Sequence, residues 1–165
     1  MIARRQIVVG LGLLLCAVSG SAHSQTNLGA DTRLIMVRHG DRSGSDEMLN
    51  ATGRARADAL VVALEGVPLD AIYSPGIKRN LDTAAPLAAA RGISVSRISD
   101  GQAARLLPQR IAGQSAIWIG NKGNLAAIWK ALGAPGAAPL EYGDLWIVTV
   151  SSVGTLRVER RHFGP

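Results

Sequence analysis

The stretch "LIMVRHGDRSGSDEMLNATGRARADALVVAL", residues 34–64, contains the pattern that decides the fold. It begins with a short apolar run, which suits a strand buried on both faces. Arg38 and His39 then open a polar loop. Asn50 is a good helix N-cap, and the apolar residues after it recur at the spacing of a helix that we expect to end at Gly66. The stretch therefore predicts a buried strand, a polar loop and an amphipathic helix.

Strands and helices alternate along most of the remaining chain. We expect further strands at residues 69–74, 93–98, 116–119, 144–150 and 155–162, and helices at 77–91, near 106–114 and from about 124 to 132. Pro86 lies inside the second helix and predicts either a kink or a late start. This alternation predicts an α/β fold, a three-layer α/β/α sandwich around a mostly parallel sheet. In such sheets ligands bind beyond the carboxyl ends of the strands, which here lead into the loops 38–42, 74–79 and 120–124.

The first 24 residues have the pattern of a secretory signal peptide. A basic start at Arg4 and Arg5 precedes an apolar run over 7–18, too short to span a bilayer, and then small polar residues. The alternative is an uncleaved membrane anchor. A signal peptide predicts an exported bacterial protein, periplasmic or secreted, with no stable membrane association after the leader is removed. Cys16, the only cysteine, lies in this leader, so we expect no disulfide in the exported chain.

Length and composition indicate one globular domain over residues 25–165. The chain has 165 residues, of which 47% are hydrophobic and 18% charged, and this suits a single packed core. Its net charge of +6 favours anionic ligands such as phosphates. The arginines are scattered rather than clustered in a stripe with aromatic residues, so we expect no nucleic-acid partner. No set of His, Cys and carboxylate residues has metal-ligand spacing, and we expect neither a metal nor a cofactor.

His39 stands at the end of a predicted buried strand between Arg38 and Arg42. Nearby positive charge lowers a histidine pKa and favours the neutral ring, whose free nitrogen is a nucleophile toward phosphorus. Arginines bind phosphate oxygens in a bidentate fork, and Arg79, early in the second helix, can reach back over the strand ends. The alternatives are a surface histidine in a basic loop and a solvated helix arginine.

Longer segments carry a resemblance to a known family. They are an Arg-His-Gly triplet at 38–40, a Leu-x-x-x-Gly-x-x-x-Ala helix at 49–57, a Tyr-Ser-x-x-x-x-Arg-x-x-x-Thr-Ala block at 73–84, and the later runs "WIGNKGNLAAIWKALG" and "EYGDLWIVTV". In this order and spacing they resemble the histidine phosphatase superfamily, with its phosphoglycerate-mutase-like fold, and most of all its small bacterial members without a cap domain. The resemblance runs over residues 34–161, essentially the whole predicted domain.

The resemblance implies a hydrolase that acts on a phosphorylated small molecule or a phosphoprotein. It makes His39 the nucleophile that takes the phosphoryl group, and Arg38 and Arg79 the residues that hold its oxygens. Arg42 occupies a position where relatives also often carry a basic residue. The implied mechanism has two steps, formation of a phosphohistidine and then attack by water, and it requires no metal.

The chain departs from the family pattern in the loop after the fourth predicted strand. Relatives usually have Gly-His-Ser there, with a second catalytic histidine, whereas this sequence has Gly120, Asn121 and Lys122. An Asn121 amide can donate a hydrogen bond to a phosphoryl oxygen but carries no positive charge. Lys122 either returns that charge next to the expected helix start or points to solvent. The alternative function is therefore a pseudo-phosphatase that binds a phosphorylated or anionic ligand without turning it over.

The general acid has several candidates. Asp41 is the nearest to the triplet, and Asp46, Glu47 and Asp100 are alternatives, each of which also suits an ordinary solvated or capping carboxylate. We expect His162, in the last predicted strand among charged residues, to be exposed. We expect the three tryptophans to be packing residues of the core.

Overall fold

The computed structural model describes residues 27–165, so the predicted signal peptide lies outside the described residues. Six strands and four helices follow one another in that part of the chain. In order they are β1 (Thr32–Arg38), α1 (Ala51–Ala63), β2 (Ala71–Ser74), α2 (Lys78–Arg91), β3 (Val95–Arg97), α3 (Asp100–Arg110), β4 (Ser115–Gly120), α4 (Lys122–Leu132), β5 (Asp144–Val150) and β6 (Leu156–His162).

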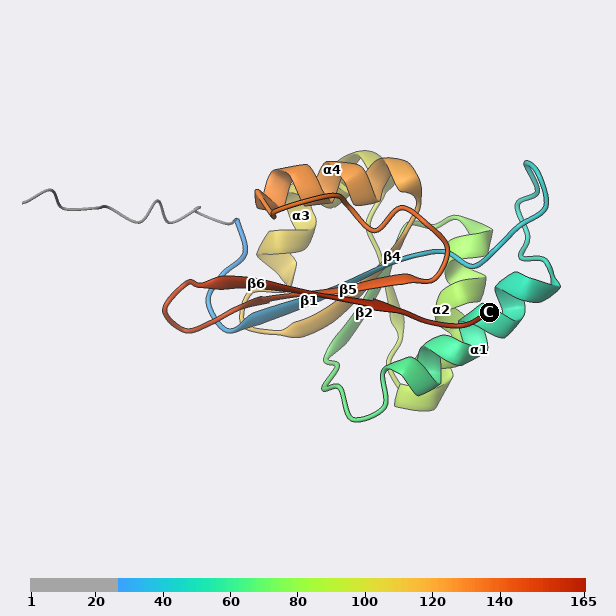
Figure 1. The fold of residues 1–165 in the computed structure, drawn as a ribbon, viewed down its shortest axis with the longest axis horizontal. Helices are drawn as coiled ribbons and strands as arrows, with labels where there is room; N and C mark the ends of the chain where they lie inside the picture. Colours follow the sequence, from blue (N-terminus) through green and yellow to red (C-terminus); the bar gives the residue numbers. More distant parts are fainter. Residues whose placement is uncertain (1–26) are drawn as a thin grey trace, which may run out of the picture.

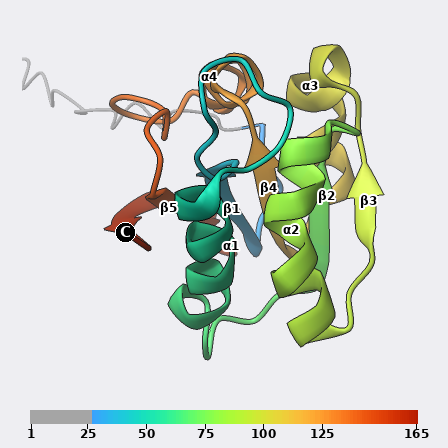
Figure 2. The same cartoon turned by 90° about the vertical axis from the view of Figure 1, so that its right-hand side faces the viewer.

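The strands form one sheet in the order β3-β2-β4-β1-β5-β6. β1 pairs in parallel with β4, and β2 pairs in parallel with both β3 and β4. β5 is antiparallel to β1 and to β6, so it alone runs against the other strands. α1 and α2 lie side by side on one face of the sheet, and α3 and α4 lie together on the other (Figures 1 and 2). The predicted three-layer α/β/α fold with a mostly parallel sheet is confirmed.

Each face of the sheet has its own apolar core. The alternation along β1 shows the division: Ile35 and Val37 face the cluster that packs on α1 and α2, while Leu34 and Met36 face the cluster under α3 and α4. All three tryptophans are buried on the second side, as the sequence predicted, and two of their rings meet edge to face with centroids 5.0 Å apart. With both faces covered, the central strands hold their ends in fixed positions.

Two helix starts differ from the sequence-based expectation, and a third decides between the two effects expected of Pro86. α2 begins at Lys78, so the late start predicted from Pro86 is wrong; packing against α1 holds the helix through the proline. α3 begins at Asp100, several residues before the expected helix, because its polar first turn has no apolar spacing to reveal it. α4 begins at Lys122 rather than near residue 124, because Asn121 caps it.

The loop after β1 is pressed against the first turn of α1. A Cβ atom on Gly53 would lie 2.1 Å from the Asp41 carbonyl oxygen, and one on Gly40 would lie 2.5 Å from the Gly53 carbonyl oxygen. Asn50 fastens the same junction: its side chain accepts from the Gly53 N–H at 2.8 Å, and its own N–H donates to the Asp41 carbonyl at 3.0 Å. The two glycines therefore allow a backbone contact that fixes where the loop leaves the sheet.

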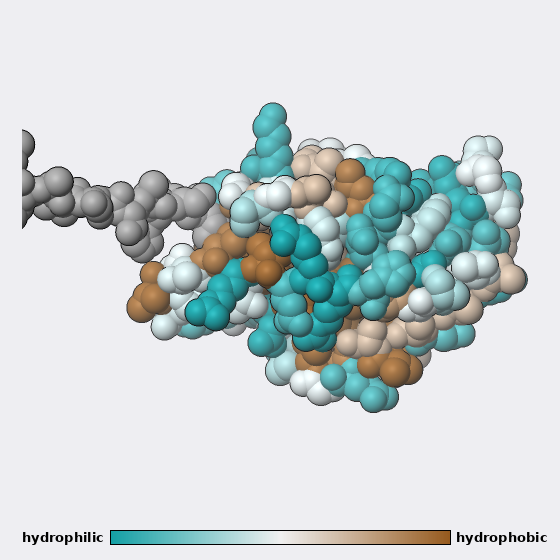
Figure 3. All heavy atoms as spheres, viewed as in Figure 1, coloured by the Kyte–Doolittle hydropathy of each residue, from teal (hydrophilic) through white to brown (hydrophobic). Residues whose placement is uncertain are grey.

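β6 forms one edge of the sheet, and most of its residues are exposed and charged. The front of the molecule, where β6 lies, is accordingly largely hydrophilic, with separate apolar patches (Figure 3). Charged side chains on an edge strand hinder pairing with another chain. Among residues 27–165, no helix combines the length and the apolar character needed to cross a bilayer.

Replacing Gly53 with alanine should destabilise the fold. The new Cβ would meet backbone atoms of Asp41, which cannot move without shifting the loop after β1. We expect the free energy of unfolding to fall by roughly 2 kcal/mol. Urea unfolding followed by circular dichroism measures this change.

Gly101→Ala is the matched control, because Gly101 also lies in the first turn of a helix but has no atom within 4 Å of its built Cβ. It should raise stability by about 0.5–1 kcal/mol, through the loss of glycine flexibility. Equal effects of the two substitutions would contradict the close packing of the loop on α1.

Candidate functional site

The carboxyl ends of β1 and β4 and the start of α2 meet at one edge of the sheet. His39 follows β1, and its backbone N–H donates to the Gly120 carbonyl at the end of β4 at 2.8 Å. Arg79 lies in the first turn of α2 and reaches the His39 ring. The structure therefore brings together the loops that the sequence placed beyond the strand ends.

The His39 imidazole is buried, with 1% of the residue exposed, and both of its nitrogens have partners. The Arg79 Nε–H points at Nε2 across 3.1 Å, and Nδ1 lies 2.7 Å from the Gly40 carbonyl oxygen. A guanidinium can only donate, so Nε2 must accept and the ring hydrogen must sit on Nδ1, where it is donated to Gly40. The arrangement assigns a neutral ring whose Nε2 lone pair faces the arginine.

Burial and charge both keep this ring neutral. The pKa of His39 is lowered from its ordinary value to about 4, and burial is the largest cause. The positive charges of Arg79, Arg38 and Arg42 act in the same direction, while the hydrogen bond to Gly40 opposes them in part. At neutral pH the imidazole is therefore uncharged and surrounded by guanidinium groups, as the sequence predicted.

Arg38 is partly buried and is held by the loop that precedes β5. Its Nη1 donates to the Leu140 carbonyl at 3.2 Å, and its Cζ lies 3.8 Å from the centroid of the Tyr142 ring. Its Nε is buried and has no hydrogen-bond partner among the described residues. Burial lowers the pKa of Arg38 below its ordinary value, against the opposing influence of Tyr142 and Glu141. One donor of this cation is thus unpaired within residues 27–165.

Arg42 lies in the outer part of the same cluster. It is partly exposed, its Nη1 donates to the Asp46 carbonyl at 3.0 Å, and its charge acts on both His39 and Arg38. Asp46 and Glu47, two of the alternative acids, are exposed. Solvent exposure therefore increases across the cluster, from the buried histidine to the partly exposed Arg42 at its rim.

Thr83 is a buried residue of α2 that the residue-by-residue reading did not single out. Its hydroxyl accepts from the Gly40 N–H at 2.8 Å and donates to the Arg79 carbonyl at 2.7 Å. Both capacities of the hydroxyl are used, so it ties the backbone beside His39 to the helix turn that carries Arg79. The Arg-x-x-x-Thr spacing was the signal for this link, because residues four apart lie on the same helix face.

Asp41 faces Arg56 of α1 rather than the histidine ring. Its Oδ2 accepts from Arg56 Nε at 2.6 Å, and Oδ1 lies 3.5 Å from Nη2. Arg56 is buried and also donates through Nη1 to the Phe163 carbonyl at 2.7 Å. The ion pair gives Asp41 a bracing role between its loop, α1 and the last strand, and we leave it out of the catalytic set proposed below.

Asn121 caps α4 and is tied to α3. Its side-chain oxygen accepts from the Asn124 N–H at 3.2 Å, and its Nδ2 donates to Asp100 Oδ2 at 2.9 Å. The other oxygen of Asp100 accepts from Asn124 Nδ2 at 3.1 Å. Among residues 27–165, Asn121 makes no hydrogen bond to His39 or to the arginines around it. The Asn121 amide, which the sequence predicted to bind phosphate, instead links the first turns of α3 and α4.

Lys122 is the first residue of α4, and its ammonium group pairs with Glu141 Oε1 at 3.1 Å. About half of the Lys122 side chain is exposed, so this is a rim contact with the loop before β5 rather than a contact with the histidine. His162 is exposed near the end of β6, as expected.

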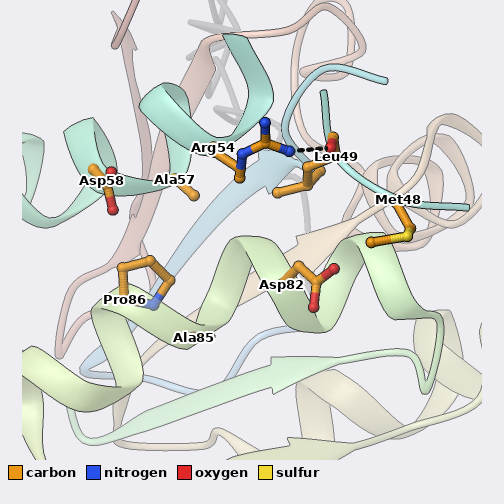
Figure 4. Close-up of a pocket in the computed structure, with 8 residues that line it drawn as sticks. All are labelled: Met48, Leu49, Arg54, Ala57, Asp58, Asp82, Ala85 and Pro86. Atoms are coloured by element: carbon orange, nitrogen blue, oxygen red, sulfur yellow. Dashed lines mark hydrogen bonds between the residues drawn. The ribbon is translucent and has the colours of Figure 1, made fainter. Parts of the chain in front are cut away.

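A groove between α1 and α2 has a volume of about 330 Å³ (Figure 4). Met48, Leu49, Ala57, Ala85 and Pro86 supply most of its apolar lining. Two of its charged groups are already paired: Arg54 donates to the Leu49 carbonyl, and Asp82 binds Lys78. The groove contains no histidine, whereas the His39 cluster joins a neutral imidazole to several guanidinium groups, and the cluster is the candidate site. Within residues 27–165, no three His, Cys, Asp or Glu side chains gather where they could hold a metal ion.

Comparisons with known proteins concern the family and the fold of the chain. Residues 34–100 match the family model of the histidine phosphatase superfamily (branch 1). No curated protein sequence matches the chain significantly. Among solved structures, YhfR from Bacillus stearothermophilus shares 20% identity, with 77% of this chain and 95% of that chain covered and a TM-score of 0.62.

Two further structures show the same fold. Phosphoserine phosphatase from Entamoeba histolytica, solved with 3-phosphoglyceric acid, shares 16% identity over 81% of this chain and 97% of its own, with a TM-score of 0.61. The protein histidine phosphatase SixA, solved with tungstate, shares 17% identity over 79% of this chain and 96% of its own, with a TM-score of 0.57. The family match, which runs from β1 through β3 to the first residue of α3, supports the histidine phosphatase superfamily for this chain, and the solved structures show that the domain has the same fold.

Proposed function

We propose that the chain is a metal-independent phosphatase that hydrolyses a phosphomonoester or a phosphorylated protein side chain through His39. The observation that carries this proposal is the contact between Arg79 Nε and His39 Nε2, because it places an unprotonated nucleophilic nitrogen beside a phosphate-binding group. The similar structures include a phosphoserine phosphatase and a protein histidine phosphatase, which supports substrates of this class.

In the first step the Nε2 lone pair attacks the phosphorus atom, a P–N bond forms, and the bond from phosphorus to the leaving group breaks. The leaving group departs with that electron pair and takes a proton from solvent. In the second step a water oxygen attacks the same phosphorus, the P–N bond breaks, and the electron pair returns to Nε2. The products are the dephosphorylated substrate and inorganic phosphate, with the excess proton released to solvent.

The arginines supply the electrostatic part of the reaction. Arg79 donates to Nε2 in the unliganded site and would turn this donor to a phosphoryl oxygen once substrate is bound. The unpartnered Nε of Arg38 is a second donor, and Arg42 adds positive charge from the rim. Donors that are already in place need little reorganisation as negative charge shifts on the phosphoryl group, and this is usually a large term in catalysis.

Asn121 supports the second candidate function, a pseudo-phosphatase that binds a phosphorylated or anionic ligand without turnover. It stands where relatives usually carry a second catalytic histidine, and its amide is held by Asp100 and Asn124. Loss of one well-placed electrostatic donor typically slows a reaction by about 10²–10³. The Lys122 ammonium pairs with Glu141 rather than with a group beside His39. We favour a slow phosphatase, because the nucleophile and its arginines are intact.

We also propose that the protein acts after export, in the bacterial periplasm or outside the cell. This rests on the leader pattern of the first 24 residues, and the site chemistry neither requires nor opposes it.

His39 should become phosphorylated during turnover of an aryl phosphate. With 32P-labelled p-nitrophenyl phosphate and rapid quenching in base, we expect acid-labile label on the wild-type chain, since a P–N bond to imidazole survives base and hydrolyses in acid. His39→Ala should carry no label and release no nitrophenol. His162→Ala, at the exposed histidine, should behave as wild type.

Turnover that is unchanged in His39→Ala would contradict the phosphatase proposal. Tungstate binding without label or turnover in the wild-type chain would favour the pseudo-phosphatase instead.

Asn121→His should increase turnover by about 10–10³-fold, because an imidazole there would restore the missing donor. The same change should cost about 1 kcal/mol of stability, because histidine is a poorer helix N-cap than asparagine. Asn121→Ser is the matched control: serine caps the helix but lacks the amide that donates to Asp100, so stability should fall less than in Asn121→His, and turnover should stay near the wild-type rate. Steady-state kinetics and urea unfolding test both statements. A rate in Asn121→His no higher than in Asn121→Ser would show that the position has no part in catalysis.

A further inference from the structure

The loop before β5 holds Arg38 more closely than simple packing requires. Leu140 accepts a hydrogen bond from Nη1 at 3.2 Å, and the Tyr142 ring lies against the guanidinium with 3.8 Å between Cζ and the ring centroid. The hydrogen bond fixes one end of the guanidinium, and the ring fixes its plane. Together the two contacts leave the side chain little freedom to turn away from the strand end.

The orientation of Arg38 matters because its Nε is buried without a partner among the described residues. A buried donor of a cation is costly to leave unpaired, and an anionic acceptor would relieve that cost. The donor is therefore held in place before its acceptor arrives. Such preorganisation reduces the entropy that is lost when a ligand binds.

Tyr142 borders the nucleophile as well as the arginine. The centroids of its ring and the His39 ring are 5.8 Å apart, with an angle of 63° between the planes. One aromatic ring thus contacts both groups that the reaction brings to the phosphoryl group.

We propose that Tyr142 is a positioning residue of the phosphoryl site: its ring holds the Arg38 guanidinium beside His39, so that the free Nε–H donates to a phosphoryl oxygen. This inference rests on the phosphatase function proposed above. The ring, rather than the hydroxyl, is the part that acts, because the hydroxyl forms no hydrogen bond within residues 27–165. The neighbouring ion pair between Lys122 and Glu141 is exposed, and such pairs contribute little to holding a loop.

Tungstate binding to the full chain, measured by isothermal titration calorimetry at fixed ionic strength, tests the proposal without depending on turnover. Tyr142→Phe keeps the ring and should bind within about twofold of wild type. Tyr142→Leu removes it and should weaken binding by about 5- to 30-fold, the range expected for losing a partly desolvated cation–π contact. Tyr142→Gln should weaken binding to a similar degree, and it decides the question if the leucine variant does not fold.

Tyr73→Leu is the matched control, since Tyr73 is the other tyrosine of the chain and packs in the core under α3 and α4. It should lower the stability to urea and leave the tungstate affinity unchanged. Wild-type affinity in a folded Tyr142→Leu or Tyr142→Gln variant would overturn the positioning role alone, as would equal weakening in Tyr142→Phe. Absence of tungstate binding to the wild-type chain would overturn this inference and the proposed phosphoryl site together.

Discussion

A neutral imidazole buried among guanidinium groups is the constraint on which the rest of the site depends. His39 accepts from Arg79 through Nε2 and donates through Nδ1 to Gly40. Burial, together with the charges of the nearby arginines, favours the uncharged ring and lowers its pKa. The same conditions favour the binding of an anion. A bound phosphoryl group would offset the repulsion between the arginines and would accept a hydrogen bond from the unpaired Nε of Arg38. Nucleophilicity and anion binding therefore have one physical origin in this structure.

The fold builds this arrangement by joining segments that are distant in sequence. Parallel pairing of β1 with β4 brings the strand end before His39 to the start of α4. Thr83 ties the Gly40 backbone to the turn that carries Arg79. The contact between Gly40 and Gly53, and the ion pair between Asp41 and Arg56, hold the following loop against α1. These contacts hold the loop after β1 and the first turn of α2 in place. They thereby fix the positions of His39 and Arg79.

Local patterns revealed the layered fold and the meeting of His39 with Arg79, because apolar periodicity and strand order dictate which loops share an edge of the sheet. They did not reveal where α3 begins, because its polar first turn resembles a loop. Nor did they reveal the capping role of Asn121, which depends on Asn124 and on Asp100 from another helix. Tyr142 was not identified from the sequence for the same reason. A single aromatic residue in a loop gives no pattern, and its contact with Arg38 is seen only in the folded structure.

The state of the His39 ring is the most direct test of this account. Imidazole 15N chemical shifts of the full chain, followed by NMR from pH 8 to pH 3, report both the tautomer and the pKa. We expect the hydrogen on Nδ1 and the lone pair on Nε2 throughout the neutral range, with protonation only as the pH approaches about 4. A midpoint near the ordinary histidine pKa of about 6.5, or a hydrogen on Nε2, would contradict the buried nucleophile on which the account is built.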